Sequence, residues 1–284
     1  MRIELEKRQE RSKTLAWASP IIAVLATMVT GGLVFAALGK PPLAALWVFF
    51  VEPFASLWSL EELVVKATPL ILIGVGLSIS YRANVWNIGA EGQLTAGALA
   101  GATVPILAHG WNTPATLLAM LVLGAIGGML WGLIPALLKI RAGANEILVS
   151  LMLVYVSQLL LDWLVRGPWR DPHGYNFPKS VAFEDWQTIP TIGDGRLNFG
   201  IVIALAVALA LSVLMRRTIK GYEVRVMGEA PRAGRFAGFS SERMVLFAFL
   251  LSGGLAGLAG VIEVASTVGQ LQPNISPGYG FTAI

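Results

Sequence analysis

The sequence contains no cysteine and only two histidines, His109 and His173, among its 284 residues. Disulfides, thiolate catalysis and cysteine-based metal sites are therefore excluded, and a histidine-rich metal or haem site has almost no ligands. The glycine-rich Lys-Ser/Thr loop that binds nucleotide phosphates is also missing, so this chain is not expected to hydrolyse ATP itself. We expect no catalytic residues, no metal and no cofactor.

Charge is scarce as well. Only 13% of the residues are charged, whereas soluble domains contain about a quarter. Hydrophobic residues make up 55% of the chain and the mean hydropathy is +0.68. Several continuous apolar runs are long enough to cross a bilayer, and they lack the alternation of a β-barrel. The sequence predicts an all-α, polytopic membrane helical bundle, with the bilayer and not nucleic acid as its surroundings.

Seven apolar runs predict the spans of a transmembrane domain over residues 15–284, which follows an N-terminal segment, 1–14. The aromatic-rich stretch 43–62 contains Glu and Pro and is read as an interfacial helix, although a further span there would invert everything downstream. Fifteen of the 21 Lys and Arg residues lie on the side that this topology places inside, which favours a cytoplasmic N-terminus. The long polar segment 165–198 is then an ordered outer loop. The expected spans are Leu15–Leu38, Leu63–Ser80, Gln93–Ala108, Pro114–Leu138, Ile147–Leu164, Phe199–Met215 and Met244–Ile262.

Small residues are frequent in the third and fourth of these spans. Gly124, Gly128 and Gly132 form two overlapping Gly-x-x-x-Gly pairs. Because such pairs let helix backbones approach closely in a membrane, they indicate packing and not chemistry.

The stretch 84–93 is polar although it lies between two expected spans. An acid, two carboxamides and two glycines are costly there unless they face protein or water. One interpretation is a short polar turn; the other is a broken, re-entrant element that lines a pathway. Trp86 could stack on a solute, although anchoring at the membrane interface is the simpler role. The candidate residues are Trp86, Asn87, Gly89, Glu91, Gly92 and Gln93.

The loop 221–243 predicts a short helix. Pro231 suits a first helical turn, Gly238 can supply the left-handed residue that ends the helix, and Ser240 can cap the following span. Alanines at 230, 233 and 237 recur at helical spacing and give the helix a flat, small face. Such a face suits docking into a groove of another protein. The alternative is a solvated connector whose arginines only follow the charge bias.

The chain stops at Gly278-Tyr-Gly-Phe-Thr-Ala-Ile284 without a polar tail. This stop resembles the entrance to another apolar element. We therefore expect a C-terminally truncated product.

Four motifs together resemble the permease subunit of bacterial ABC importers. More narrowly, they resemble the nucleoside and simple-sugar branch of the superfamily that also includes ribose and branched-chain amino acid permeases. The resemblance runs from about residue 60 to 284, and members of the family are usually several dozen residues longer. The motifs are Asn87-Ile-Gly-Ala-Glu-Gly-Gln93, Asn145-Glu146, Gly228-x-x-x-x-Ala233-x-x-x-Gly238 and Ser276-Pro-Gly-Tyr-Gly-Phe-Thr-Ala-Ile284.

The resemblance implies partners and roles. A second permease or a copy of this chain, two cytoplasmic ATPase subunits and an extracytoplasmic binding protein would complete an importer in the bacterial inner membrane. Loop 221–243 would be the cytoplasmic coupling helix, and the polar stretch would lie on the translocation pathway. A nucleoside ranks first as solute and a simple sugar such as ribose second. The implied coupling residues are Gly228, Glu229, Ala230, Ala233, Ala237 and Gly238.

Two other classes of protein stay open at this point. In an ion-coupled secondary transporter, Glu91 would carry protons or cations. In a permease, Glu91 could instead sit near the positive end of the following helix and hold the broken element in place. An intramembrane enzyme is disfavoured because no paired catalytic residues are found.

Overall fold

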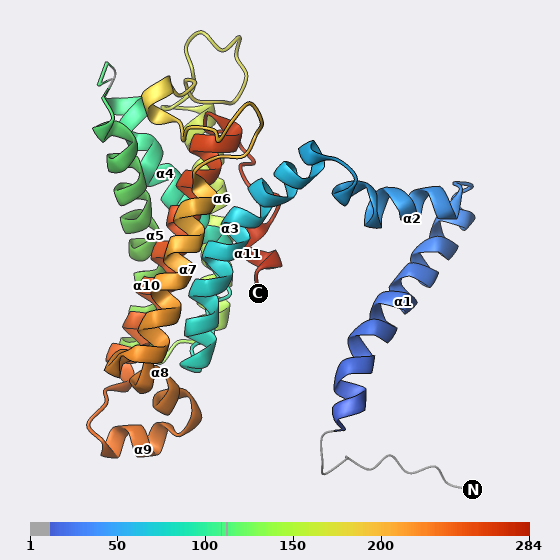
Figure 1. Cartoon of the computed structure of the whole chain (residues 1–284). Helices are drawn as coiled ribbons and strands as arrows, with labels where there is room; N and C mark the ends of the chain where they lie inside the picture. The colour runs from blue at the N-terminus through green and yellow to red at the C-terminus, as the bar shows by residue number, and fades with distance from the viewer. Residues whose placement is uncertain (1–11, 109, 112) are drawn as a thin grey trace, which may run out of the picture. The chain divides into compact units, whose positions relative to one another are not determined.

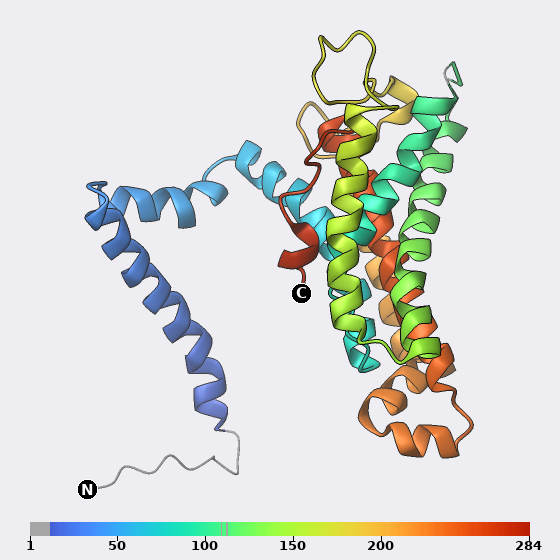
Figure 2. The same ribbon diagram turned by 180° about the vertical axis from the view of Figure 1, so that it is seen from behind.

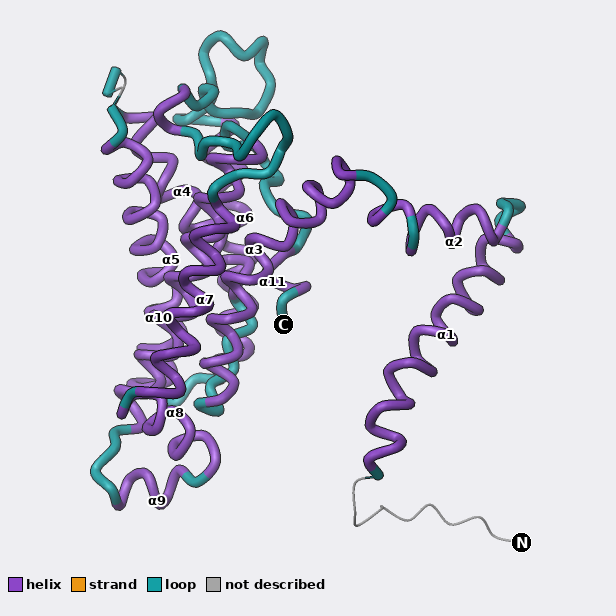
Figure 3. The backbone as a smooth tube through the Cα atoms, in the orientation of Figure 1, coloured by secondary structure: helices purple, strands orange, loops and turns teal. Residues whose placement is uncertain are grey.

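The computed structural model describes residues 12–108, 110–111 and 113–284. This described part contains no β-strand, and its isolated bridge joins Thr191 to Asn198 (Figure 3). The chain divides into two compact units, residues 1–63 and 64–284. Of the predicted N-terminal segment 1–14, residues 1–11 lie outside the described part of the chain.

The first unit holds helix α1 (Lys13–Ala37) and helix α2 (Pro42–Phe50), followed by a 3-10 turn. The two helices pack together, with the Phe35 and Phe49 ring centroids 5.8 Å apart. With nine residues, α2 is about 14 Å long, roughly half of a bilayer core. The alternative of a further span within 43–62 is therefore wrong. The helix expected over that whole stretch is also too long, since it ends at Phe50.

Helix α3 (Leu57–Arg82) contains the boundary between the two units, and the remaining helices belong to the second unit. It begins six residues before the expected Leu63, because glutamate is a good helix former and Glu61 and Glu62 do not interrupt it. The long helices that follow are α4 (Ala90–Leu107), α5 (Ala115–Ala142), α6 (Glu146–Arg166), α7 (Gly200–Arg217) and α10 (Ser241–Glu263). The short ones are α8 (Ile219–Glu229), α9 (Pro231–Phe236) and α11 (Tyr279–Thr282).

Among the described residues, six helices are long and apolar enough to cross a membrane. They are α1, α3, α5, α6, α7 and α10, the last continued by a π-helical turn to Val268. This confirms the predicted polytopic helical bundle. Helix α4 lies where the third span is expected but is not one of the six, so the predicted number of seven spans stays a prediction.

The centre of the second unit is formed by α4, α5 and α10, which pack most extensively on one another. Glycines set their separation: a Cβ on Gly97 of α4 would lie 2.1 Å from the Gly257 Cα of α10. A Cβ on Gly128 of α5 would lie 2.1 Å from the carbonyl oxygen of Gly253. The packing role predicted for the Gly-x-x-x-Gly pairs is thereby confirmed.

The two ends of this bundle differ (Figures 1 and 2). Helices α8 and α9 lie at one end, and the loop 167–199 lies at the other. The loop is ordered by the main chain after α10, because the Ser180 N–H donates to the Leu271 carbonyl at 2.9 Å and the Ile189 N–H to the Ala265 carbonyl at 2.8 Å. This confirms the ordered loop expected over 165–198, while its outer location stays a prediction.

Candidate functional site

The helical path breaks between α3 and α4. Residues 83–89 are non-helical, and Asn84 takes a left-handed conformation with φ of +56°. The Val85 N–H turns back to the Ser80 carbonyl at 3.0 Å and so closes the end of α3. The break is shorter than the predicted element, 84–93, since residues 90–93 already form the first turn of α4. We call residues 83–95, the break and the start of α4, the polar element.

The two carboxamides of the polar element pair with each other. Asn87 Nδ2 donates to Gln93 Oε1 at 2.8 Å, and Gln93 Nε2 donates to Asn87 Oδ1 at 3.0 Å. Asn87 Nδ2 also donates to the Ser252 hydroxyl of α10 at 2.9 Å. Both amides are buried, with 0% and 1% of their surface exposed. Because an amide in an apolar interior needs such partners, these hydrogen bonds fasten the break to α4 and α10.

The glycines of the polar element bring its backbone against α6. A Cβ on Gly89 would lie 2.7 Å from the Ser150 carbonyl oxygen, and one on Gly92 would lie 2.9 Å from the Val154 Cα. The Ser150 hydroxyl accepts a hydrogen bond from the Ile88 N–H at 3.3 Å. Larger side chains at Gly89 and Gly92 would therefore push α4 away from α6.

Glu91 connects the polar element to the end of the described chain. Its Oε2 accepts a hydrogen bond from the Gly280 N–H of α11 at 2.6 Å. A Cβ on Gly280 would lie 2.2 Å from the Glu91 amide nitrogen, so the two backbones touch. The carboxylate also lies in the first turn of α4, where the helix dipole favours a negative charge. Two motifs separated by 189 residues thus meet at one carboxylate.

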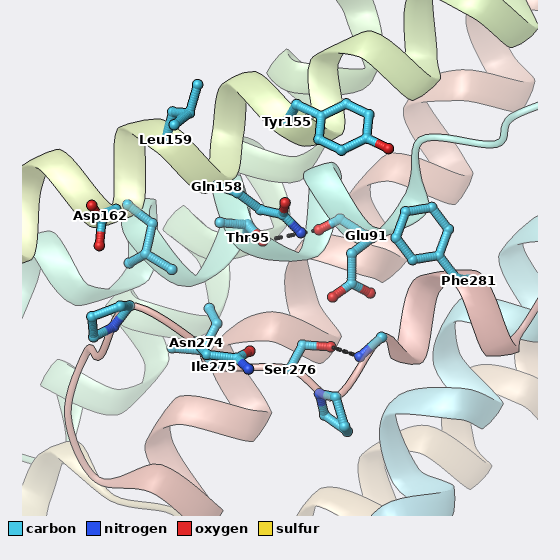
Figure 4. A pocket seen from close by; sticks show the side chains of 14 residues that line it. Glu91, Thr95, Tyr155, Gln158, Leu159, Asp162, Asn274, Ile275, Ser276 and Phe281 are labelled. Carbon is cyan, nitrogen blue, oxygen red and sulfur yellow. Dashed lines mark hydrogen bonds between the residues drawn. The ribbon is translucent and has the colours of Figure 1, made fainter.

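Glu91 also lines a cavity of about 670 Å³ between α4, α6 and residues 273–281 (Figure 4). Its polar lining includes Thr95, Gln158 and Asn274, and its aromatic lining consists of Tyr155 and Phe281. This volume falls within the usual range for small-molecule sites. Neither Asn87 nor Gln93 lines the cavity, so the structure separates Glu91 from the amide pair.

Several cavity residues were missed at the level of sequence. Gln158 is a carboxamide inside an otherwise apolar run, which is a signal that could have identified it. Tyr155 lies one helical turn before it on α6, and Asn274 comes from the non-helical segment after α10. Nothing in the sequence alone places that segment beside α4 and α6.

Trp86 is half exposed and is not part of the cavity lining. Its ring packs against Tyr81, with centroids 5.1 Å apart. The Tyr81 hydroxyl is 3.4 Å from the Asn87 carbonyl oxygen, to which it donates a long hydrogen bond. The aromatic pair therefore covers the outside of the break.

Asn145 and Glu146 begin α6 and join it to α5. The Asn145 Oδ1 caps the helix by accepting from the Ile147 N–H at 2.9 Å. Glu146 forms an ion pair with Lys139 in the last turn of α5. Both residues thus stabilise the α5–α6 connection.

Helix α8 was not predicted, because its glycines and charges weaken the helical pattern. It is held against the bundle by its buried residues Gly221, Val224 and Met227. A Cβ on Gly228 would lie 1.9 Å from the Arg82 carbonyl oxygen at the end of α3. Gly228, one of the predicted coupling residues, therefore brings α8 into close contact with the bundle.

Helix α9 follows directly and has the predicted boundaries. Pro231 occupies its first turn, Gly238 has a φ of +87°, and the Ser240 hydroxyl caps α10 by accepting from the Arg243 N–H at 3.3 Å. The other predicted coupling residues are exposed: Glu229, Ala230, Ala233, Ala237 and Gly238. Phe236, which the sequence did not single out, is 95% exposed. An exposed alanine face with a free aromatic ring is suited to contact with another protein.

No group of three or more His, Cys, Asp or Glu side chains that could hold a metal ion occurs within the described ranges. The side chains that line the cavity beside Glu91 offer hydrogen-bonding groups, aromatic rings and carboxylates.

Comparison with known proteins places the chain in a family. Residues 59–284 match the family described as "Branched-chain amino acid transport system / permease component". The chain is 38% identical to a glucose ABC transporter permease protein of Haloferax volcanii, over 99% of this chain and 77% of the relative. It is 28% identical to a guanosine ABC transporter permease protein of Bacillus subtilis, over 87% and 72%.

A nucleoside ABC transporter permease protein of Lactococcus lactis is 24% identical over 88% of this chain and 71% of the relative. No solved structure matches the chain. The matched family and these relatives confirm the resemblance inferred from the four motifs. The chain therefore belongs to the branched-chain amino acid transport permease family and is a multi-pass permease subunit of an ABC importer.

Proposed function

We propose that the chain forms the inward pathway for a neutral, hydroxyl-rich solute, either a nucleoside or a simple sugar. The observation that carries this proposal is the cavity beside Glu91. Its carboxylate, amide and hydroxyl groups can exchange hydrogen bonds with sugar hydroxyls, and Tyr155 and Phe281 offer faces for a sugar or base ring. The pathway contact is thus assigned to Glu91, Thr95 and Gln158, and the amide pair Asn87–Gln93 to the support behind them.

The two solute classes are each favoured by a separate observation. The Asn87–Gln93 string favours a nucleoside, as do the relatives named for guanosine and nucleosides. A simple sugar is favoured by the relative named for glucose, which has 38% identity over nearly the whole chain.

Energy for import comes in this proposal from two cytoplasmic ATPase subunits. Helix α8 contacts the end of α3 through Gly228, whereas the alanines and Phe236 of α9 are exposed. ATP-driven closure of the ATPases would then move α9 as a rigid lever and tilt the attached spans. A second permease subunit and an extracytoplasmic binding protein complete the assembly.

The orientation of the chain is part of the same proposal. The end that bears α8 and α9 is rich in Lys and Arg, which supports a cytoplasmic location for it under the positive-inside rule. The proposal also includes a cytoplasmic N-terminus, which the distribution of Lys and Arg along the sequence favours, and a location in the bacterial inner membrane.

The rival function is an ion-coupled carrier in which Glu91 takes up protons. Glu91 accepts a hydrogen bond from Gly280, which supports a structural role for the carboxylate. A carrier also has no use for an exposed helix such as α9.

Uptake of labelled nucleosides, pentoses and glucose by cells tests the proposal. The cells express the complete set of transporter genes with or without this chain, and a matched strain carries an ATPase subunit that cannot hydrolyse ATP. Uptake should survive collapse of the proton gradient at preserved ATP and should disappear in the ATPase-deficient strain, and the favoured label names the solute. Uptake that ends with the gradient and ignores the ATPase variant would contradict the proposal.

A further inference from the structure

A second cavity, of about 250 Å³, lies between α3, α7 and α8. Its walls on α3 and α7 combine apolar side chains, among them Val75, Leu211 and Met215, with the hydroxyl groups of Ser78 and Ser212. Because α3 and α7 are both long and apolar enough to cross a membrane, the wall between them is expected to face lipid, with α8 at its end. It is separate from the cavity beside Glu91, with which it shares no lining residue.

Three arginines line the same groove, one from each helix. Arg82 ends α3, Arg216 is in the last turn of α7, and Arg225 projects from α8. The contact between Gly228 and the Arg82 carbonyl brings these helix ends together. An apolar groove with three guanidinium groups at one end has the charge distribution of a receptor for an amphiphilic anion.

Among the residues that the structure describes, the three guanidinium groups have no acidic partner. None of them forms an ion pair with another described residue, and Glu223, which is close in sequence, is paired with Lys220 at 2.8 Å. The C-terminal dipoles of α3 and α7 favour two of these positive charges but do not neutralise three. A phosphate group can accept bonds from several guanidinium groups at once, more effectively than from lysines.

We propose that this groove binds one anionic phospholipid, with its phosphate at Arg82, Arg216 and Arg225 and an acyl chain against α3 and α7. The apolar side chains of the groove favour a lipid over free phosphate, because inorganic phosphate has no apolar part that could contact them. They also disfavour a soluble protein partner, because such a partner could reach the arginines at the helix ends but would leave the apolar side chains between α3 and α7 uncovered. The bound lipid would bridge α3, α7 and α8, and so stiffen the end of the bundle that carries α9.

The test is native mass spectrometry of the purified full chain titrated with phosphatidylglycerol and with phosphatidylcholine. The variant R82Q/R216Q/R225Q removes the three groove arginines. The control R141Q/R217Q/R243Q removes three exposed arginines that do not line the groove, with the same change in net charge. A further variant, Ala208→Phe, fills the groove and leaves the arginines in place.

The wild type and the control should retain one phosphatidylglycerol in preference to phosphatidylcholine. The groove triple variant should bind phosphatidylglycerol roughly tenfold to a hundredfold more weakly. Ala208→Phe should also weaken binding, and inorganic phosphate should displace the lipid only poorly.

Three results would overturn the proposal. An equal loss in both triple variants would mean general electrostatic attraction. Full displacement by inorganic phosphate, or normal binding by Ala208→Phe, would mean a phosphate site without an acyl-chain groove. Unchanged phosphatidylglycerol binding by the groove triple variant would mean that the three arginines do not hold the lipid.

Discussion

The polar element and α9 carry two of the motifs that characterise this chain, yet they have opposite surroundings. In the polar element the polar side chains are buried, and Asn87, Gln93 and Glu91 find their partners inside the chain. In α9 the small and apolar side chains Ala233, Ala237 and Phe236 are exposed. A buried polar group must be satisfied internally, whereas an exposed apolar patch gains by contact with a partner.

This difference indicates that the polar element supports the helix bundle, whereas α9 is suited to contact with a partner protein. We infer that the polar element holds α4, α6, α10 and α11 in one arrangement, with only Glu91 and Thr95 reaching the cavity. In helix α9 only Gly234 is buried, so its other side chains are available for contact with a partner protein. The variants below test this division, from the largest expected effect to the smallest.

The packing that holds α4 in place should be the most sensitive feature. In Gly97→Ala the added Cβ would lie 2.1 Å from the Gly257 Cα, so α4 and α10 must separate. We expect a loss of about 3 kcal/mol of stability and little folded protein. Gly74→Ala on α3 is the control, since its Cβ meets no atom within 4 Å. Thermal unfolding in detergent measures both, and equal midpoints would contradict the packing argument.

The amide pair should come next. Asn87→Leu leaves the Gln93 amide without its partner in a buried site, which should cost about 2 kcal/mol. Gln158→Leu, an exposed residue on the cavity wall, should keep the unfolding midpoint and reduce uptake. If Asn87→Leu unfolded like the wild type while Gln158→Leu transported normally, the assignment of support and contact would be reversed.

A bulky residue on α9 should separate the two regions most clearly. Ala233→Trp should reduce uptake by about tenfold or more, equivalent to roughly 1.4 kcal/mol. The reason is that the indole would keep α9 out of the groove of the ATPase subunit into which it is proposed to dock. ATP hydrolysis should become uncoupled from uptake, and the unfolding midpoint should not change. Ala206→Trp, on the exposed side of α7, is the matched control. Normal coupling in Ala233→Trp would exclude α9 as the coupling helix.

Glu91→Gln should have the smallest effect. The amide oxygen can still accept from the Gly280 N–H, but the bond loses its charge, a change of about 1 kcal/mol or less. Because a glutamine can still exchange hydrogen bonds with a neutral solute in the cavity, we expect uptake to continue with little change in its pH dependence. Loss of a proton-coupled component of uptake would support the carrier instead.

The sequence predicted the features that depend on local signals. Pro231, Gly238 and Ser240 marked the boundaries of α9 and the start of α10, because proline, a left-handed glycine and a capping serine act within one helical turn. The positions of the long helices followed from continuous apolar runs. Helix α8 was missed since Gly221 and Gly228 lower helix propensity, and they are suited to close contact with the bundle instead.

The candidate site was predicted only in part. The stretch 84–93 was recognisable as polar between apolar runs, but its sequence does not reveal which side each group faces. The amide pair spans six residues, and the bond from Gly280 to Glu91 spans 189. Such contacts depend on how helices distant in sequence pack together. For the same reason Gln158, Asn274 and the arginine groove emerged only from the structure.

Hydrogen exchange of the permease, alone and with its ATPase subunits, tests the division between support and contact most directly. Amides of the polar element should exchange slowly in both states, because they are buried and bonded within the chain. Amides of residues 231–238 should exchange faster in the permease alone and slow down when the ATPase subunits bind. Unchanged exchange in α9, with new protection appearing in the polar element instead, would contradict the account.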